Sequence, residues 1–341
     1  MIEWSPTRVA ATFCMRYYEF LYVLGIRMPK DINLVFGEVL HKLVALFWHR
    51  NFEKKTKDGK LPEEKFINQF SYFYKKAVAC PFCGRVIERG NPYKWGLSSW
   101  KSLREICENF DKIENCPERR KVKFERINFK SDELPIILHW DGRHILRKFY
   151  KANIEIKKSE PAPISEKTIR FRLDSKKFRV KIDEIRAKDG KVIIRDYKSS
   201  RFIREKPIED LQLVFYQMAV ALKLKEDENF RESLGFSKKR SFDSIFNSLK
   251  TELYFLRENK ISEVKCKKGD FRDILMKIEE AEANIRKGLF SPILKDEVCK
   301  NCEYRELCKK MREKEELNFG QIELFEKEPT SRSVKTMKFE F

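Results

Sequence analysis

Residues 178–198 read FRVKIDEIRAKDGKVIIRDYK, and this stretch decides the fold of the chain. Apolar side chains alternate with polar ones in its first half, at Phe178, Val180 and Ile182. The alternation predicts a strand with one buried face, and Asp183 falls on the other face. Asp189 and Gly190 then predict a tight hairpin turn. We therefore expect the two halves of the stretch to pair as antiparallel strands.

The returning strand, residues 192–198, adds a second carboxylate and an ammonium group. Ile194, Asp196 and Lys198 share one face because they are spaced two residues apart, which puts Asp196 and Lys198 about 7 Å apart along the strand. Two carboxylates and an ammonium group are thus expected to converge at one edge of a sheet. Taken alone, the pattern also fits a solvated hairpin whose charges face water.

A helix is predicted after the hairpin. Its apolar residues recur at helical spacing, at Ile208, Leu211, Phe215, Met218 and Leu222. Gln212 and Tyr216 lie one turn apart beside this apolar stripe. Both side chains are therefore expected to lean over the charged edge of the sheet.

Phosphodiester hydrolysis is the chemistry that suits such a site. Hard divalent cations such as Mg²⁺ prefer oxygen ligands, and paired aspartates hold one or two of them. The ion lowers the pKa of a water molecule and neutralises the charge that develops on the phosphate. Lys198 would position or deprotonate that water and add positive charge.

The arrangement of KIDEI, then VIIRDYKSS, then DLQLVFY closely resembles the PD-(D/E)XK nuclease superfamily in its RecB-like branch. The likeness includes the trailing Q-x-x-x-Y motif. It implies an α/β fold with a mixed central sheet flanked by helices, as in restriction endonucleases. One departure is Val180, where the branch often carries glycine, and it bears on local strand packing. By this resemblance the catalytic residues are Asp183, Asp196, Lys198, Gln212 and Tyr216.

A further helix is predicted around Gly37-Glu38-Val39-Leu40-His41. By itself, a histidine in such a helix is more often a packed residue than a ligand. In the resembling family, a G-x-x-x-H helix supplies a neutral imidazole to the catalytic metal. The resemblance therefore implies that His41 joins Asp183 and Asp196 in binding Mg²⁺ or Mn²⁺. Three other histidines match no motif and are interpreted as structural: His49, His139 and His144.

Four of the nine cysteines lie near the two ends of the chain. Cys299, Cys302 and Cys308 form C-x2-C-x5-C, one thiolate short of the four that an iron-sulfur cluster requires. Cys14 lies early in a helical pattern that opens at Ser5-Pro6, where a lone cysteine is usually part of the core. S-P-x-R followed by C-x-R-Y-Y resembles the N-terminal signature of the RecB-like nucleases that bind such a cluster. This resemblance implies that Cys14 completes a 4Fe-4S site.

Residues 51–150 show no such resemblance. Cys80-Pro81-Phe82-Cys83-Gly84 forms a knuckle of the kind found in zinc ribbons, and Cys107 and Cys116 follow. Four thiolates make a closed tetrahedral zinc site, but the spacing of the second pair is unusual. The alternative is a helical insertion with buried thiols.

The remaining patterns complete the domain plan. We expect a loop over residues 223–241, a strand over 249–256 and a helix over 271–286 that leads to Cys299. Residues 1–50 and 151–316 then form a nuclease domain with cluster-binding ends, and residues 51–150 form a large helical insertion with a possible zinc-binding subdomain. Residues 317–341 form a charged tail.

Composition indicates a polyanionic partner. The 341 residues carry a formal net charge of +20 and 13% aromatic residues, which together with the hairpin favour nucleic acid over a membrane surface. The sequence contains no apolar run of membrane-spanning length and no signal peptide pattern, so a cytoplasmic protein with reduced thiols is expected. In that setting cysteines are metal or cluster ligands more readily than disulfides.

The resemblance implies a metal-dependent DNase that acts on single strands with free ends, in DNA repair, recombination or CRISPR-type processing. No Walker A motif occurs, so a helicase would have to be a partner protein. Two other classes stay open. One is a non-cleaving DNA-binding subunit of a larger helicase or nuclease complex, which the complete set of catalytic residue types disfavours. The other is an adaptor that recruits proteins through a zinc-bearing insertion.

Overall fold

A computed structural model describes residues 2–26, 28, 30–49, 63–78, 127–128, 134–200, 211–236 and 240–313. The elements named below are β1 (Glu3–Trp4), α1 (Pro6–Ala11), α2 (Met15–Tyr18), a π-helical turn (Glu19–Val23), β2 (Lys30–Asp31), α3 (Ile32–Trp48), α5 (Glu63–Val78), β3 (Ile127–Asn128), α7 (Leu134–Ser159), β4 (Ile164–Leu173), β5 (Lys176–Lys188), β6 (Lys191–Lys198), α8 (Leu211–Glu226), α9 (Glu228–Ser233), α10 (Phe242–Ser248), β7 (Lys250–Phe255), β8 (Lys260–Val264), α11 (Lys268–Lys287) and α12 (Asp296–Cys299).

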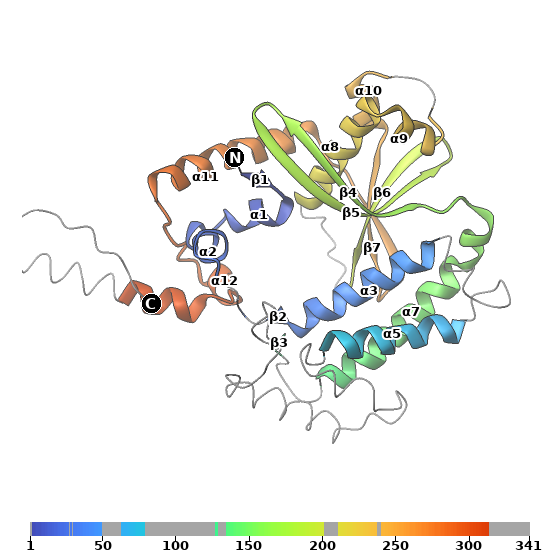
Figure 1. The fold of residues 1–341 in the computed structure, drawn as a ribbon, viewed down its shortest axis with the longest axis horizontal. Coiled ribbons are helices and arrows are strands. Elements are labelled where there is room, and N and C mark those ends of the chain that lie inside the picture. Colours follow the sequence, from blue (N-terminus) through green and yellow to red (C-terminus); the bar gives the residue numbers. More distant parts are fainter. Residues whose placement is uncertain are drawn as a thin grey trace, which may run out of the picture.

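The main sheet has six strands and is mixed. Five of its strands lie in the order β1-β5-β6-β7-β8, and the sixth strand, β4, also pairs with β5. β5 runs antiparallel to β4 and β6, whereas β6 and β7 are parallel, as are β1 and β5. β2 and β3 form a separate two-stranded sheet. A mixed sheet with helices on its flanks confirms the expected α/β class (Figure 1).

Two apolar cores lie on the two faces of the sheet. The first core joins β4 and β5 to α1, α8 and α11, and its members include Ile169, Phe178, Val180, Ile182, Phe215 and Phe271. Val180 packs there without difficulty, 1% exposed, although the family often has glycine at this point. The second core joins α3, α5 and α7 to the sheet, and its members include Phe47, Phe70, Phe149, Tyr197 and Tyr254. The sheet is therefore covered by helices from both sides.

The hairpin predicted at Asp189-Gly190 is confirmed. Both residues have positive φ, 50° and 69°, which is the backbone conformation that a two-residue hairpin turn requires. The sequence patterns did not predict β4, which precedes β5 and pairs with it over nearly its whole length. The turn between them, Asp174-Ser175, carries no glycine and so gave no strong turn signal.

The first helix begins as expected, since Ser5 Oγ accepts a hydrogen bond from the backbone N–H of Arg8 and Pro6 takes the first helical position. It ends sooner than expected. α1 stops at Ala11, and Cys14 lies in the turn before α2 rather than inside a helix. The expected loop over residues 223–241 is also wrong in part, because α8 extends to Glu226 and α9 follows, capped by Asp227.

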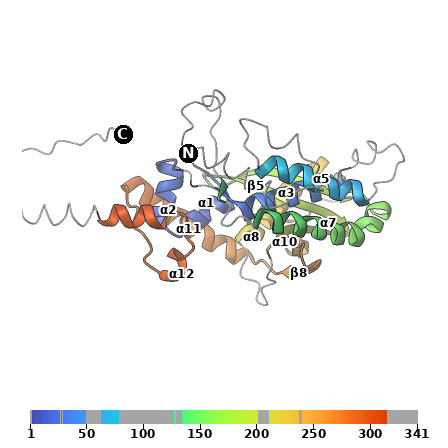
Figure 2. The same cartoon turned by 90° about the horizontal axis from the view of Figure 1, so that it is seen from below.

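Other elements agree with the sequence patterns. α3 contains the predicted helix around His41, β7 the predicted strand, and α11 the helix before Cys299. α7 runs through residue 150 without a break and packs against α3 and α5. The short helices α2 and α12 lie at one end of the molecule, away from α5 and α7 (Figure 2). Among the described helices, none is long and apolar enough to cross a membrane.

Candidate active site

The candidate site lies where β5 and β6 separate. Their pairing ends at Glu184 opposite Arg195, and the next residues along each strand are Asp183 and Asp196. Asp183 Oδ2 accepts a hydrogen bond from the backbone N–H of Tyr197, at 2.9 Å. Because the strands part here, side chains from helices on both faces of the sheet can reach the two carboxylates.

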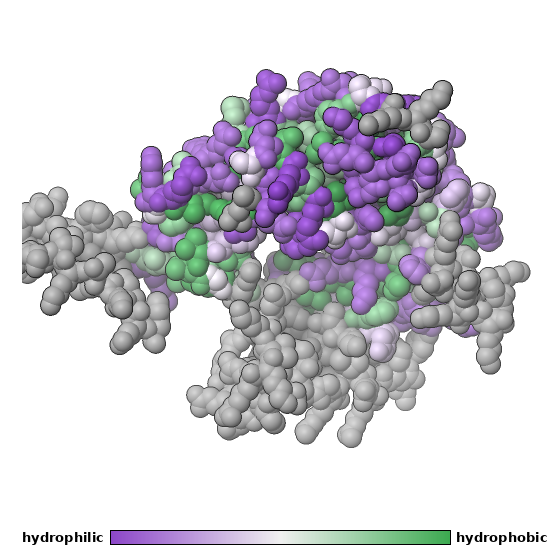
Figure 3. Space-filling view, turned by 45° about the horizontal axis from the view of Figure 1, so that its top comes forward, coloured by the Kyte–Doolittle hydropathy of each residue, from purple (hydrophilic) through white to green (hydrophobic). Residues whose placement is uncertain are grey.

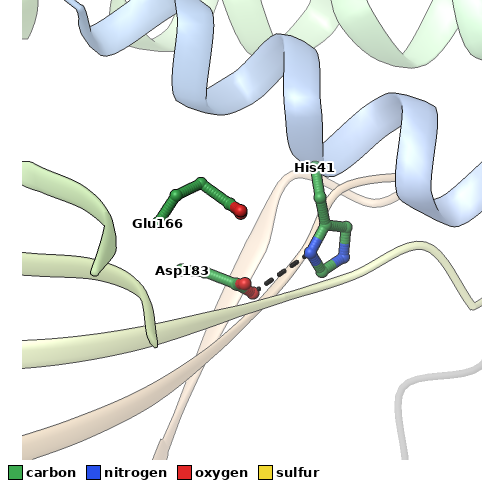
Figure 4. Close-up of side chains that lie close together, drawn as sticks. All are labelled: His41, Glu166 and Asp183. Carbon is green, nitrogen blue, oxygen red and sulfur yellow. Dashed lines mark ion pairs between the residues drawn. The ribbon is translucent and has the colours of Figure 1, made fainter. Parts of the chain in front are cut away.

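α3 supplies the histidine. His41 Nδ1 lies 3.2 Å from Asp183 Oδ2, and Figure 4 shows the ring pointing from the helix onto that carboxylate. Gly37, one turn earlier, lets the helix approach, since a Cβ there would lie 3.0 Å from Ser199 Oγ just beyond β6. The G-x-x-x-H pattern thus has a steric reason in its glycine and a chemical one in its histidine.

α8 reaches the site from the other face. Lys198 Nζ lies 2.6 Å from Asp196 Oδ2 and donates to Gln212 Oε1 at 3.4 Å. Gln212 in turn donates from Nε2 to the hydroxyl oxygen of Tyr216. These contacts form a chain in which Gln212 holds Lys198 and Tyr216 holds Gln212.

The two carboxyl groups differ in their electrostatics. Burial raises the pKa of Asp196 to about 7, and the negative charge of nearby Asp183 adds to the rise. Burial acts the same way on Asp183, but the hydrogen bond and charge of His41 outweigh it, so the pKa of Asp183 is lowered. For His41, contact with Asp183 likewise outweighs burial and raises its pKa. His41 and Asp183 therefore form an ion pair beside a carboxyl group that is easily protonated.

Sequence reasoning missed a third carboxylate, Glu166 of β4. Ligand atoms of His41, Asp183 and Glu166 all lie within 4.8 Å of one another (Figure 4). The pairing of Ser165 with Glu184 and of Lys167 with Ile182 puts Glu166 opposite Asp183. Its φ of 53° is unusual for a residue other than glycine and costs backbone energy. No sequence signal identified it, because its place depends on recognising β4.

Two cavities meet at this site. One, of about 920 Å³, is lined among others by His41, Glu166, Asp183, Asp196, Lys198 and Gln212. The other, of about 690 Å³, is lined among others by His41, Asp183, Gln212 and Tyr216. All six residues expected at the metal and catalytic centre thus line one or both of these cavities, which share His41, Asp183 and Gln212. His139, in contrast, is buried against Ser71 Oγ at 2.9 Å, whereas His49 lines the first cavity.

A buried ionic network lies directly beneath the site. Glu184, adjacent to Asp183 in sequence, is fully buried and accepts hydrogen bonds from Arg186 at 3.0 Å and Arg195 at 3.3 Å. It also accepts one from the hydroxyl of Tyr197, whose oxygen accepts from Trp48 Nε1 at 3.1 Å. The network satisfies a buried carboxylate and holds the strands rigid where they part.

The four predicted cluster cysteines meet in a separate cavity of about 630 Å³ at the other end of the molecule, whose lining includes Cys14, Cys299, Cys302 and Cys308. Burial raises the pKa of the Cys302 and Cys308 thiols, and the charges of the neighbouring cysteines add to the rise. No three of these sulfur atoms lie within 4.8 Å of one another. The other predicted metal ligands, Cys80, Cys83, Cys107 and Cys116, lie outside the described residues.

Of the comparisons with known proteins, the family model agrees with the site. A model of the PD-(D/E)XK nuclease superfamily matches residues 3–309. No curated protein matches the chain. Nine chains of solved structures match it. One of them is the crystal structure of SSO0001, which is 16% identical and for which the match covers 62% of this chain and 96% of that chain. Its TM-score of 0.27 is too low to support any argument. The match over residues 3–309 places this chain in the PD-(D/E)XK nuclease superfamily, which implies a metal-dependent nuclease.

Proposed function

We propose that the protein is a RecB-like DNA nuclease that hydrolyses phosphodiester bonds with Mg²⁺ or Mn²⁺. The convergence of His41, Asp183, Asp196 and Lys198 around one cavity carries this proposal. An imidazole and oxygen ligands suit a divalent cation of the Mg²⁺ or Mn²⁺ kind. Glu166 adds a third carboxylate to the set.

In this proposal His41, Asp183 and Asp196 hold the cation, which activates water and offsets the charge on the phosphate. Lys198 positions or deprotonates the attacking water, at the point where it now contacts Asp196. Gln212 and Tyr216 keep the Lys198 ammonium group oriented through their chain of hydrogen bonds. Loss of either should therefore impair Lys198 rather than metal binding.

The preferred substrate in this proposal is single-stranded DNA with a free end, digested as by an exonuclease. Two cavities share His41 and Asp183 in their linings, and in this proposal the strand occupies both. Exposed aromatic side chains such as Tyr72 and Trp140 offer stacking surfaces, and stacking requires unpaired bases.

The test compares linear single strands, closed single-stranded circles and blunt duplexes, all at one salt concentration and with Mn²⁺. We expect linear single strands to be digested fastest and circles to resist. Equal digestion of all three would refute the need for an end and leave an unselective endonuclease.

One alternative function is supported by a specific observation: a DNA-binding subunit that does not cleave. Asp196 already contacts Lys198, and His41 already pairs with Asp183, so the charges of these two carboxylates are balanced without a metal. Under this alternative the pure protein binds single strands but leaves them intact with Mg²⁺ or Mn²⁺. Cleavage that disappears in Asp196→Asn would exclude it.

The cysteine cavity is proposed to hold a 4Fe-4S cluster through Cys14, Cys299, Cys302 and Cys308. The four thiols line one cavity of about 630 Å³. Four thiolates are the ligand set that such a cluster requires. Protein purified without oxygen should be brown and contain four iron and four sulfide per chain. A colourless preparation with stoichiometric zinc would contradict the proposal.

The remaining proposals concern the rest of the chain. Zinc is proposed to bind to Cys80, Cys83, Cys107 and Cys116. These residues belong to a proposed insertion over residues 51–150, which interrupts a nuclease domain of residues 1–50 and 151–316. A charged tail, residues 317–341, follows the nuclease domain. A helicase is the proposed partner, in DNA repair, recombination or CRISPR-type processing in the cytoplasm. Zinc content of a variant with all four of these cysteines replaced by serine tests the first of these.

A further inference from the structure

We propose that the outer face of the β4–β5 hairpin is a phosphate track that binds the DNA strand on one side of the scissile bond. We call its cations the basic ladder: Lys181, Arg179, Arg170, Lys177 and Arg172. The inference rests on the proposed function and adds to it, because it assigns the residues that hold the strand beyond the reacting phosphate.

The pairing of β4 with β5 sets the ladder out in rungs. Thr168 lies opposite Lys181, Arg170 opposite Arg179, and Arg172 opposite Lys177. By the same register Glu166 lies opposite Asp183, so the rung before Thr168 and Lys181 belongs to the candidate active site. The ladder is thus a direct extension of the site along the hairpin.

These side chains share one face of the hairpin, and it faces solvent. The alternate residues, including Ile169, Phe171 and Val180, pack into the first core on the other face. Lys176 also points to that other face, where it pairs with Glu279 and Glu282 of α11. Arg170, Arg179 and Lys181, in contrast, have side chains that are 65%, 52% and 62% exposed.

The charge of the ladder is only partly compensated. Glu3 of β1 lies 3.3 Å from Arg170 and 3.5 Å from Arg179, and Glu166 pairs with Lys181. Within the part of the chain that the structure describes, Arg172 and Lys177 form no ion pair. Five cations thus face two carboxylates, one of which belongs to the candidate metal site. Hydrophilic side chains cover much of the upper part of the molecule as seen in Figure 3.

The ladder is also continuous with a cavity of the site. Arg179 and Lys181 line the cavity of about 690 Å³ that contains His41 and Asp183, and Ser5 and Thr7 line it from the start of α1. The lining of this cavity thus combines cationic and hydroxyl groups. Both kinds of group bind phosphate oxygens.

The spacing favours one extended strand over a duplex. Successive rungs are about 7 Å apart and the ladder extends roughly 20 Å from Asp183 to Lys177. A stretched single strand places its phosphates at a similar interval, so one rung can meet each phosphate in turn.

The first experiment measures binding without cleavage. A triple variant, Arg170→Gln, Arg172→Gln and Lys177→Gln, leaves every residue of the candidate active site in place. Affinity for a 5′-fluorescein-labelled oligothymidylate is measured by anisotropy in EDTA over a range of NaCl concentrations. Each lost phosphate contact should lower the salt slope by about 0.7, so the triple variant should lose about 2.

The matched control removes three exposed lysines outside the ladder, in Lys191→Gln, Lys260→Gln and Lys265→Gln. The control variant loses the same net charge as the ladder variant, but its DNA affinity should keep nearly the whole salt dependence of the wild-type protein. With Mn²⁺ present, the ladder variant should show a KM raised on the order of tenfold with kcat within about twofold of wild type. Equal salt slopes of DNA affinity for the ladder and control variants would refute the proposed phosphate track.

A second experiment locates the contacts on the DNA. Oligonucleotides carry three consecutive uncharged methylphosphonate linkages, placed at successive positions relative to one uncleavable bond. Wild-type protein should lose affinity most when the patch lies on one side of that bond, and the ladder variant should lose little there. An undiminished effect in the ladder variant would overturn the track. If DNA binds through the ladder but is never cut, the proposed function fails and the track stands.

Discussion

The candidate active site and the cysteine cavity are built in opposite ways. The active site lies between long strands whose backbones are hydrogen bonded along β4, β5, β6 and β7. The cysteine cavity lies among short segments, since α1 has six residues and α2 and α12 have four each. One site is held by the sheet, and the other is held by side chains from the two ends of the chain.

This difference indicates how each site should depend on the metal proposed for it. Sheet pairing and the buried network around Glu184 hold Asp183 and Asp196 in place before any cation binds. The ends of the chain meet through a few side chains, such as the hydrogen bonds of Tyr17 to Glu303 at 2.7 Å and of Tyr304 to the Ile26 carbonyl at 2.8 Å. Metal binding should therefore govern catalysis at the first site and folding at the second.

The largest effect is expected from the carboxylates of the sheet. Asp183→Asn, Asp196→Asn or Lys198→Met should lower the cleavage rate by at least about 10³-fold, equivalent to roughly 4 kcal/mol of transition-state stabilisation. The fold and single-strand affinity should survive, because strand pairing and phosphate contacts elsewhere are unchanged. Single-turnover cleavage and anisotropy measure the two properties separately.

Asp243→Ala serves as the control for this prediction, since Asp243 is an exposed carboxylate of α10 remote from the site. It should leave the rate unchanged. Cleavage at the wild-type rate in any of the three site variants would remove that residue from the catalytic assignment.

The next effect concerns the cysteine end. Cys302→Ser should abolish the proposed cluster and speed amide hydrogen exchange in residues 2–26 and 290–313 on the order of 100-fold. Exchange in β5 and β6 should change little. Mass-spectrometric exchange and iron analysis report the two ends and the metal independently.

Cys266→Ser is a matched control, because Cys266 lies outside the cavity, near Thr251 Oγ1 at 3.7 Å. That variant should keep its iron content and the protection of residues 2–26 and 290–313 from amide hydrogen exchange. If exchange in the sheet rises as much as exchange at the ends in Cys302→Ser, the two regions form one cooperative unit and the contrast between them fails.

The smallest effect is a pH dependence of the sheet site. Because burial raises the pKa of Asp196 to about 7, the metal-free protein holds a proton there below that pH, and His41 holds another through its pairing with Asp183. A cation displaces these protons. Mn²⁺ affinity should thus fall about tenfold per pH unit for each proton released below pH 7.

The sign for stability follows from the same shift. A carboxyl group whose folded pKa is raised stabilises the fold at low pH and loses that contribution as pH rises toward about 7. Metal-free Asp196→Asn should therefore gain most in Tm over wild type at pH 8 and gain less at pH 5. Calorimetry of Mn²⁺ binding in buffers of different ionisation enthalpy counts the protons, and a pH-independent affinity would contradict the assignment.

Local sequence patterns predicted much of this fold because strands, turns and helices depend largely on residues that are close together in the sequence. Alternation identified β5, the Asp189-Gly190 pair identified its turn, and helical spacing identified α3, α8 and α11. β4 was missed as a strand partner because its turn lacks glycine. Cys14 was placed in a helix because the apolar pattern continues through the break after Ala11.

The sequence by itself determined the chemical inventory: which carboxylates, histidine, lysine and cysteines are available, and on which strands and helices most of them lie. Only the tertiary structure showed that the adjacent Glu184 is buried against Arg195, whereas Asp183 lines the cavity as the alternation predicts. It also brought in Glu166 through strand register. The physical reason is that alternation assigns a face to each residue, whereas the point at which two strands part depends on all the elements packed against them.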